Sequence, residues 1–256
     1  MTTRAPSRRL GDTIHRLGAV ASTQGEAARL AAAGASEGTV VTATHQSAGR
    51  GRRGREWLDA PGESLLVSIV LRPPILPGLA PQLSLVAAVA VVDALGTAGV
   101  TATIRWPNDV MVGERKICGM LSEAVTAREG MIEHVILGIG LNVNQRDFPA
   151  SIRTLATSVR IETGREHAVE EMLRTVLAAL GGWYGRFVEA GLEAVRPAWL
   201  ERAQGIGGRA RAADGREGAA IGLDAYGALL LRTDSGETVR LVAGEVAMEV
   251  EHAPGH

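Results

Sequence analysis

The stretch His45-Gln46-Ser47-Ala48-Gly49-Arg50-Gly51-Arg52-Arg53-Gly54-Arg55-Glu56-Trp57 contains three glycines and four arginines. No large apolar side chain before Trp57 could bury the segment in a core, so the pattern predicts a loop. Glycine lets the backbone approach a ligand closely, and guanidinium groups make two-pronged bonds to carboxylate or phosphate. The stretch therefore indicates an anion-binding loop. The alternative is a solvated basic turn, which the glycine spacing disfavours.

The glycines of this loop also spell G-x-G-x-x-G, the pattern of dinucleotide-binding turns. Such a turn needs a strand running directly into the first glycine and a helix beginning at the last. Here the apolar run 39–43 ends well before Gly49, and Pro61-Gly62 lie too close behind Gly54 for a regular helix. No G-x-x-x-x-G-K-[ST] occurs in the chain, so a P-loop is excluded as well.

Apolar runs flank the loop on both sides and predict the sheet that holds it. Residues 38–43 lead into it, and the continuous run 64–71 is typical of a fully buried strand. Further strands are predicted at 12–21, 101–105, 110–112, 116–117, 120–125 and 131–137, with helices at 27–33 behind the capping box Thr23-x-x-Glu26, at 83–95 closed by Gly96, at 168–188 and at 192–202. Beyond Gly205, five short strands predict a small barrel. We expect an α/β catalytic domain at 1–204 and a small domain at 205–256.

Composition limits the class of protein. With 256 residues and 46% hydrophobic residues, the chain can bury a sizeable core. A net charge of -1 and 3% aromatic residues argue against a general nucleic-acid binder. The longest apolar run, 85–92, is far shorter than the roughly 18 residues of a membrane span, and the basic start has no apolar segment behind it. The single cysteine, Cys118, is expected in the core. We predict a cytoplasmic protein that binds neither nucleic acid nor membranes.

Familiar catalytic and metal-binding motifs are missing from the sequence: there is no H-E-x-x-H, C-x-x-C or G-x-S-x-G. His252 and His256 stand four apart, but the Pro-Gly between them prevents the helix that would align them, so no protein-bound metal is predicted. What remains is a set of cations and amides at predicted strand ends. Phosphoryl and nucleotidyl transfer use such groups to position substrates and neutralise charge.

Four blocks of the sequence, in order, resemble the signature blocks of bacterial biotin protein ligases. They are Gly49-Arg50-Gly51-Arg52-Arg53-Gly54-Arg55, Arg105-Trp106-Pro107-Asn108-Asp109, Lys116-Ile117-Cys118-Gly119-Met120-Leu121-Ser122-Glu123 and Gly138-Ile139-Gly140-Leu141-Asn142-Val143-Asn144. The resemblance implies a mixed-sheet catalytic domain followed by an SH3-like domain. It also implies a two-step reaction, in which biotin and Mg-ATP give biotinyl-5'-AMP and the acyl group passes to a lysine of a biotin carboxyl carrier domain.

The resemblance also implies roles for individual residues. Lys116, Arg50 and Arg52 are expected to be catalytic. Biotin contacts are expected from Ser22, Thr23, Gln24, Gln46, Arg50, Gly51, Arg52 and Lys116, and nucleotide contacts from Arg53, Trp57, Asn108, Asp109 and Asn142, with Trp57 over the adenine. A buried ureido ring needs its donors and acceptors paired, and Ser, Thr and Gln supply both kinds.

The sequence departs from the family pattern at two positions: Arg105 stands where lysine is usual, and Gln24 where asparagine is usual. Only about 20 residues precede Ser22, too few for the DNA-binding domain of some relatives, so an enzyme without repressor function is expected. A lipoate ligase or octanoyl transferase of related fold is the alternative enzyme. An RNA-binding module would need an aromatic, basic barrel face, but Tyr226 is the sole aromatic residue of the barrel segment.

Overall fold

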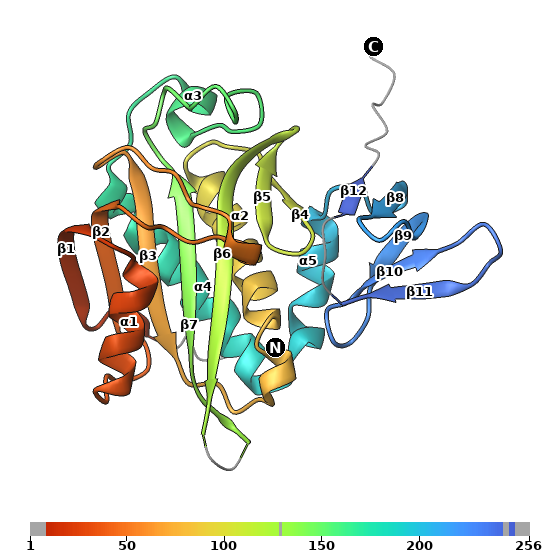
Figure 1. Cartoon of the computed structure of the whole chain (residues 1–256), viewed down its shortest axis with the longest axis horizontal. Coiled ribbons are helices and arrows are strands. Elements are labelled where there is room, and N and C mark those ends of the chain that lie inside the picture. Colours follow the sequence, from red (N-terminus) through yellow and green to blue (C-terminus); the bar gives the residue numbers. More distant parts are fainter. Residues whose placement is uncertain (1–8, 128–129, 243–245, 249–256) are drawn as a thin grey trace, which may run out of the picture.

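The computed structural model describes residues 9–127, 130–242 and 246–248. Within them lie two sheets (Figure 1). The first is ordered β1-β2-β3-β7-β6-β5-β4, from β1 (Ile14–Val20), β2 (Val40–Gln46), β3 (Ser64–Leu71), β4 (Thr103–Arg105), β5 (Asp109–Val112), β6 (Arg115–Thr126) and β7 (Ile132–Asn142). The pair β1 and β2 is parallel and the other pairs are antiparallel, so the sheet is mixed as predicted.

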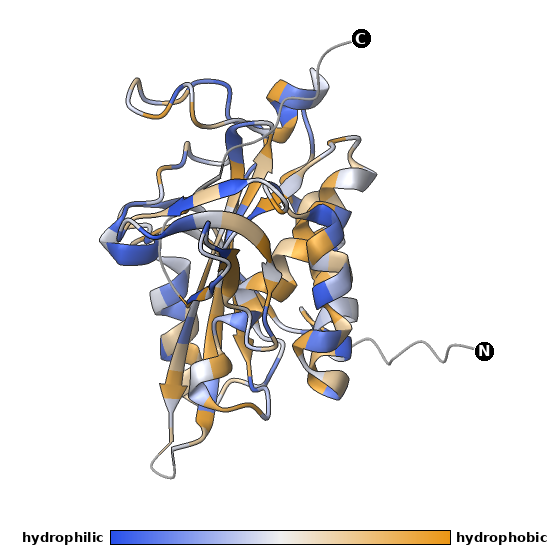
Figure 2. Cartoon of the chain, turned by 90° about the vertical axis from the view of Figure 1, so that its right-hand side faces the viewer, coloured by the Kyte–Doolittle hydropathy of each residue, from blue (hydrophilic) through white to orange (hydrophobic). Residues whose placement is uncertain are grey.

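Strand β3 lies in the middle of this sheet, and all eight of its residues are buried, as its continuous apolar run predicts. Successive side chains of β3 point to opposite faces of the sheet. Leu65, Val67, Ile69 and Leu71 join the large core beneath α2 (Gln82–Thr97) and α4 (Val169–Ala190), whereas Val70 packs with α1 (Thr23–Ala32). Because side chains alternate along a strand, Leu66 and Ser68 point to the α1 face. Figure 2 shows apolar residues concentrated on the strands and on the helix faces turned toward them.

The segment Pro77–Thr97, which joins the turn η2 (Pro77–Leu79) to α2, is the one helical stretch of the described residues with the length and composition of a membrane span. It is mostly buried inside the protein against the sheet and α4, which identifies it as a core helix. The remaining helical elements are η1 (Arg52–Gly54), α3 (Val159–Thr163), η3 (Leu192–Ala194) and α5 (Arg196–Arg202).

The second sheet is antiparallel and ordered β11-β10-β9-β8-β12, from β8 (Arg209–Ala212), β9 (Glu217–Leu223), β10 (Leu229–Arg232), β11 (Thr238–Leu241) and β12 (Val246–Met248). It packs beside α5 and α2. The indole nitrogen of Trp106 donates to the carbonyl of Gly227 (3.1 Å), and Gly227 is packed against Leu85. The five predicted strands are confirmed, whereas the domain boundary at 204/205 stays a prediction.

Three local predictions were wrong. Ser22, not Thr23, caps α1, because its hydroxyl accepts from the amide of Gln24. Helix α2 continues past Gly96 to Thr97, and the left-handed residue behind it is Gly99, with φ +86°. The helix predicted at 192–202 is broken into η3 and α5. The predicted pair His252 and His256 lies outside the described residues.

Candidate active site

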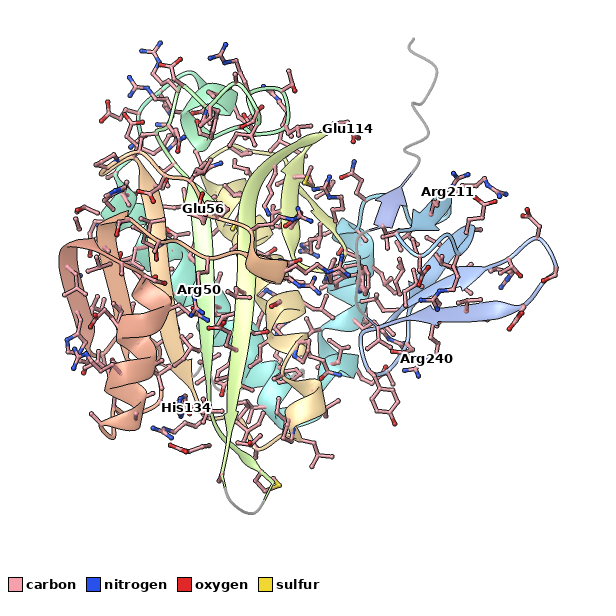
Figure 3. All side chains as sticks on the ribbon, viewed as in Figure 1. Arg50, Glu56, Glu114, His134, Arg211 and Arg240 are labelled. Atoms are coloured by element: carbon pink, nitrogen blue, oxygen red, sulfur yellow. The ribbon has the colours of Figure 1, made fainter. Side chains whose placement is uncertain are left out.

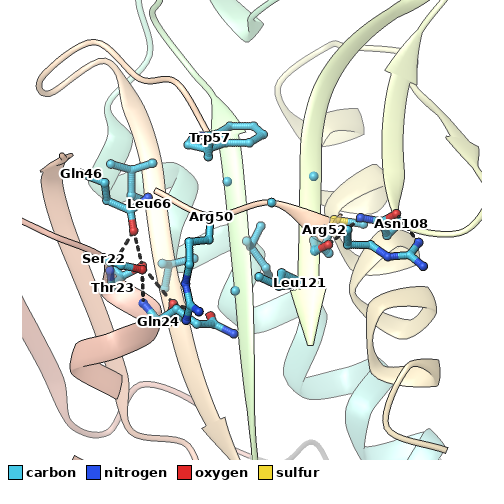
Figure 4. Close-up of a pocket in the computed structure, with 18 of the residues that line it drawn as sticks. Ser22, Thr23, Gln24, Gln46, Arg50, Arg52, Trp57, Leu66, Asn108 and Leu121 are labelled. Atoms are coloured by element: carbon cyan, nitrogen blue, oxygen red, sulfur yellow. Dashed lines mark hydrogen bonds between the residues drawn. The ribbon is translucent and has the colours of Figure 1, made fainter. Parts of the chain in front are cut away.

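A pocket opens on the α1 face of the first sheet, beneath the arginine loop (residues 46–57, Figure 4). The residues that line it come from α1, the loop, β3, β6 and β7, and from Asn108, which precedes β5. All eight residues predicted to contact biotin line it, together with two of the predicted nucleotide contacts, Trp57 and Asn108. The full lining is Ser22, Thr23, Gln24, Gln46, Arg50, Gly51, Arg52, Trp57, Leu66, Val67, Ser68, Asn108, Lys116, Gly119, Met120, Leu121, Gly138, Ile139 and Gly140.

A chain of hydrogen bonds fixes the polar end of the pocket. The Thr23 hydroxyl donates to Oε1 of Gln46 (3.0 Å) and lies 2.9 Å from the Ser68 hydroxyl. Ser68 donates in turn to Oε1 of Gln24 (3.1 Å), whose Nε2 donates to the carbonyl of Ile136 (3.0 Å). Buried hydroxyls and amides held in this way present donors and acceptors in set directions. Ser68 was not predicted, because a serine inside an apolar strand reads as a core residue.

Glycine at 138 makes room for Gln24, which is longer than the asparagine usual in the family. A Cβ built on Gly138 would lie 2.5 Å from Oε1 of Gln24. Any side chain at 138 must therefore displace the Gln24 amide.

If the pocket binds biotin, as the family resemblance implies, Gly138→Ala is expected to weaken that binding by about tenfold, since the displaced amide loses a buried hydrogen bond. Adding Gln24→Asn should restore binding, because the shorter side chain retreats from the new methyl group. Calorimetric titration with biotin measures both effects. Gly96→Ala, within α2 and with nothing near its added Cβ, is the control. A double variant no better than Gly138→Ala would contradict this explanation of Gln24.

The ring of Trp57 lies over glycines of the central strands. Cβ atoms built on Gly140 and Gly119 would lie 2.6 Å and 3.3 Å from ring atoms of Trp57. Gly119 of the third sequence block and Gly140 of the fourth therefore allow the indole to lie on the sheet. Its Nε1 is buried and has no hydrogen-bond partner within the described residues, which leaves a donor available to a ligand.

The arginine loop has its own short-range order. The Gly51 amide donates to the carbonyl of Arg55 (2.7 Å), and the Trp57 amide to that of Gly49 (3.0 Å). Arg53 has a left-handed backbone with φ 57° in the single turn η1 (Arg52–Gly54). It is exposed and lies outside the pocket lining.

Two arginines of the loop have partners elsewhere in the sheet. Arg50, labelled in Figure 3, pairs with Glu123 of β6 at 3.1 Å. Arg52 donates to Oδ1 of Asn108 (2.9 Å). Burial, and then the neighbouring charge of Arg53, lower the pKa of Arg52. The attraction of an anion in the pocket would oppose both effects.

Lys116, the single lysine of the sequence, lies at the edge of the pocket. Its Nζ is 2.6 Å from Oδ1 of Asp109, while Arg105 donates to the other carboxylate oxygen at 3.0 Å. Nζ also lies 5.9 Å from the centre of the Trp57 ring. Burial raises the pKa of Asp109, but Lys116 and Arg105 outweigh burial and lower it overall. Asp109 is therefore paired with two cations, one on each carboxylate oxygen.

This ion cluster predicts an acid-sensitive contribution to stability. Because the pKa of Asp109 is lower in the folded chain, its stabilisation is complete above the unfolded value of about 3.9 and is lost as the pH falls through the folded value. Asp109→Asn should lower the melting temperature at pH 7, and the difference from the unsubstituted protein should shrink toward pH 2. Melting curves across that range check this, and a constant difference would contradict it.

Asn142, also predicted to contact the nucleotide, lies apart from the pocket at the end of β7. Its Nδ2 donates to the carbonyl of Thr157 (2.9 Å), and its buried Oδ1 has no partner within the described residues. Asp109 reaches the pocket only through Lys116. The structure therefore brings the predicted biotin residues together and leaves Arg53, Asp109 and Asn142 around the margin.

Residues 18–142 match the model of the biotin/lipoate A/B protein ligase family, and residues 213–248 match the biotin protein ligase C-terminal domain. The chain is 39% identical over 223 residues to the bifunctional ligase/repressor BirA of Bacillus spizizenii, covering 85% of this chain and 68% of BirA. It is 38% identical to a biotin--[acetyl-CoA-carboxylase] ligase of Paracoccus denitrificans, covering 88% of this chain and 96% of that protein.

Solved structures agree with these relatives. Biotin protein ligase from Aquifex aeolicus in complex with biotin and ATP superimposes with a TM-score of 0.79 at 29% identity, covering 94% of this chain and 100% of that one. The predicted family resemblance is thus confirmed by the family models, by the relatives and by the fold. The chain belongs to the biotin protein ligases.

Proposed function

We propose that the pocket beneath the arginine loop binds biotin, and that this chain, an ATP-dependent biotin protein ligase, forms biotinyl-5'-AMP there. One observation carries the proposal: eight residues from separate segments of the sequence, all predicted to contact biotin, line a single pocket. The hydrogen-bonded amides and hydroxyls of Thr23, Gln24 and Gln46 suit a ureido ring, which has both donors and acceptors.

In the first step, a carboxylate oxygen of biotin attacks the α-phosphorus of ATP, and pyrophosphate leaves with the bonding electrons. Lys116 moves from Asp109 to the reacting oxygens, where its ammonium group balances the growing negative charge. Arg50 and Arg52 hold the anionic groups from above. In the second step, an amine of the acceptor lysine attacks the acyl carbon, AMP leaves, and the amine loses a proton.

We assign the nucleotide to the margin of the pocket, where Trp57, Asn108 and Asp109 approach it and Arg53 and Asn142 lie further out. The buried donor of Trp57 and the unpaired acceptor of Asn142 support this assignment. Mg²⁺ would arrive with ATP as part of the substrate. The described residues hold no cluster of three or more His, Cys, Asp or Glu side chains that could hold a metal ion.

The acceptor is the lysine of a biotin carboxyl carrier domain, and the enzyme works in the cytoplasm without nucleic acid or membrane. The test is to incubate the protein with ATP and biotin, lipoate or octanoate, and to follow pyrophosphate release and labelling of a purified carrier domain. Release with biotin and labelling of one carrier lysine are expected. Release with lipoate or octanoate alone would establish the alternative acyl ligase instead.

A further inference from the structure

Two residues that flank the arginine loop meet beneath it. Nδ1 of His45 lies 2.9 Å from Oδ2 of Asp59. The amide of Gln46 donates to the other oxygen, Oδ1, at 3.3 Å. Nearby, the Gly62 amide donates to the carbonyl of Thr44 (2.7 Å). The two ends of the loop are therefore joined at its base.

Asp59 is the more buried partner: its side chain is 1% exposed, against 34% for His45. A carboxylate can be buried at low cost only when its oxygens are hydrogen-bonded. Both oxygens of Asp59 have partners, and these are the last two residues of β2. Asp59 is therefore held in one position and holds the start of the loop in turn.

The contact with Gln46 connects this base to the pocket. The pairing of β2 with β3 stops at Ala43, so Gln46 is paired with Val20 of β1 on one side and has no β3 partner on the other. The backbone amide of Gln46 donates to Asp59. The side-chain Oε1 of Gln46 accepts from the backbone amide (2.8 Å) and the hydroxyl of Thr23. The bonds from Thr23 fix the orientation of the Gln46 side-chain amide. Its Nε2, which carries two donor hydrogens, therefore points away from Thr23.

We propose that Asp59, supported by His45, is a positioning residue for the biotin pocket. It fixes the backbone at Gln46, whose side chain lines the pocket, and closes the base of the arginine loop before any ligand arrives. The proposal rests on the assignment of biotin to this pocket. A loop closed at its base has fewer conformations to lose on binding, so substrate binding need not supply that ordering.

The test compares Asp59→Ala with Asp59→Asn. Asparagine can still accept from the Gln46 amide and bond to the His45 ring, whereas alanine can do neither. We expect Asp59→Ala to raise the KM for biotin by about tenfold, the effect of one lost hydrogen bond to a charged group, with kcat changed much less. Asp59→Asn should restore most of the loss. Amide exchange across 46–57 should be faster in Asp59→Ala.

Asp93→Ala is the matched control. Asp93 also uses both oxygens, accepting from the Trp183 indole (2.7 Å) and from Arg202 (3.1 Å), but it joins helices far from the loop. It should lower the melting temperature without moving the KM for biotin. If Asp59→Ala does not fold, His45→Ala removes one of the two base contacts and should raise the KM by a smaller factor.

An unchanged biotin KM in the folded variant would overturn the proposal, as would a rise in KM equal to that of Asp93→Ala. Failure of the unsubstituted protein to bind biotin would instead overturn the pocket assignment. The two failures are therefore distinguishable.

Discussion

Lys116→Ala is expected to reduce pyrophosphate release from biotin and ATP by at least about a hundredfold, because a preorganised charge facing a developing anion contributes on that order to kcat. The fold should persist. Arg105 would still pair with Asp109, so the buried carboxylate keeps a partner. Pyrophosphate release and thermal melting measure the two effects.

Arg115→Ala is the control for Lys116→Ala. Arg115 is the adjacent residue of the same hairpin and pairs with Glu162 at 2.9 Å, away from the pocket. It should keep near-normal adenylation. Near-normal pyrophosphate release from Lys116→Ala would show that Lys116 lacks the assigned role.

Arg52→Gly is expected to form biotinyl-5'-AMP but to release it about ten- to a hundredfold faster, the effect of one lost charge-assisted hydrogen bond. The structure adds a physical route for escape. Arg52 and Asn108, which are hydrogen-bonded to each other, line both the pocket and a neighbouring groove toward Pro107 and Tyr226. Removing the guanidinium group of Arg52 is expected to join the pocket to this groove.

The measurement is biotin labelling of albumin by each variant in the presence of biotin and ATP. Arg55→Gly adds the same chain freedom and removes the same charge from an exposed position of the loop outside the pocket lining. It should label albumin no more than the unsubstituted protein. The proposed retention by Arg52 is wrong if adenylation persists and labelling does not rise.

Much of the sheet could be predicted because its strands are defined by local composition. The run 64–71 coincides with β3, since a strand buried on both faces is a continuous run of mostly apolar residues whose ends are visible in the sequence. The end of α2 could not be predicted in the same way. Gly96 resembles a cap, but the helix continues by one residue and the Thr97 hydroxyl donates to the carbonyl of Ala94 (2.7 Å).

The pocket was predictable where its residues belong to recognisable blocks, as Arg50, Arg52 and Lys116 do. Contacts between blocks were not. Glu123 reaches Arg50 across 73 positions of sequence, and only the pairing of β6 with β7 determines which face it lies on. Likewise, no local pattern of the sequence indicates that the side chain of Asp59 bonds to His45 and Gln46. Such contacts depend on the three-dimensional register of the strands.

The ion pair between Lys116 and Asp109 has a chemical consequence for the protein's own surface. An acyl phosphate reacts with neutral amines, and the side chains of this sequence offer one amine, held beside a carboxylate at 2.6 Å. Arginine supplies the remaining side-chain positive charge apart from histidine, and a guanidinium group is effectively always protonated. A ligase that leaked its intermediate would therefore mark neighbouring proteins while its own side chains stayed almost free of acylation.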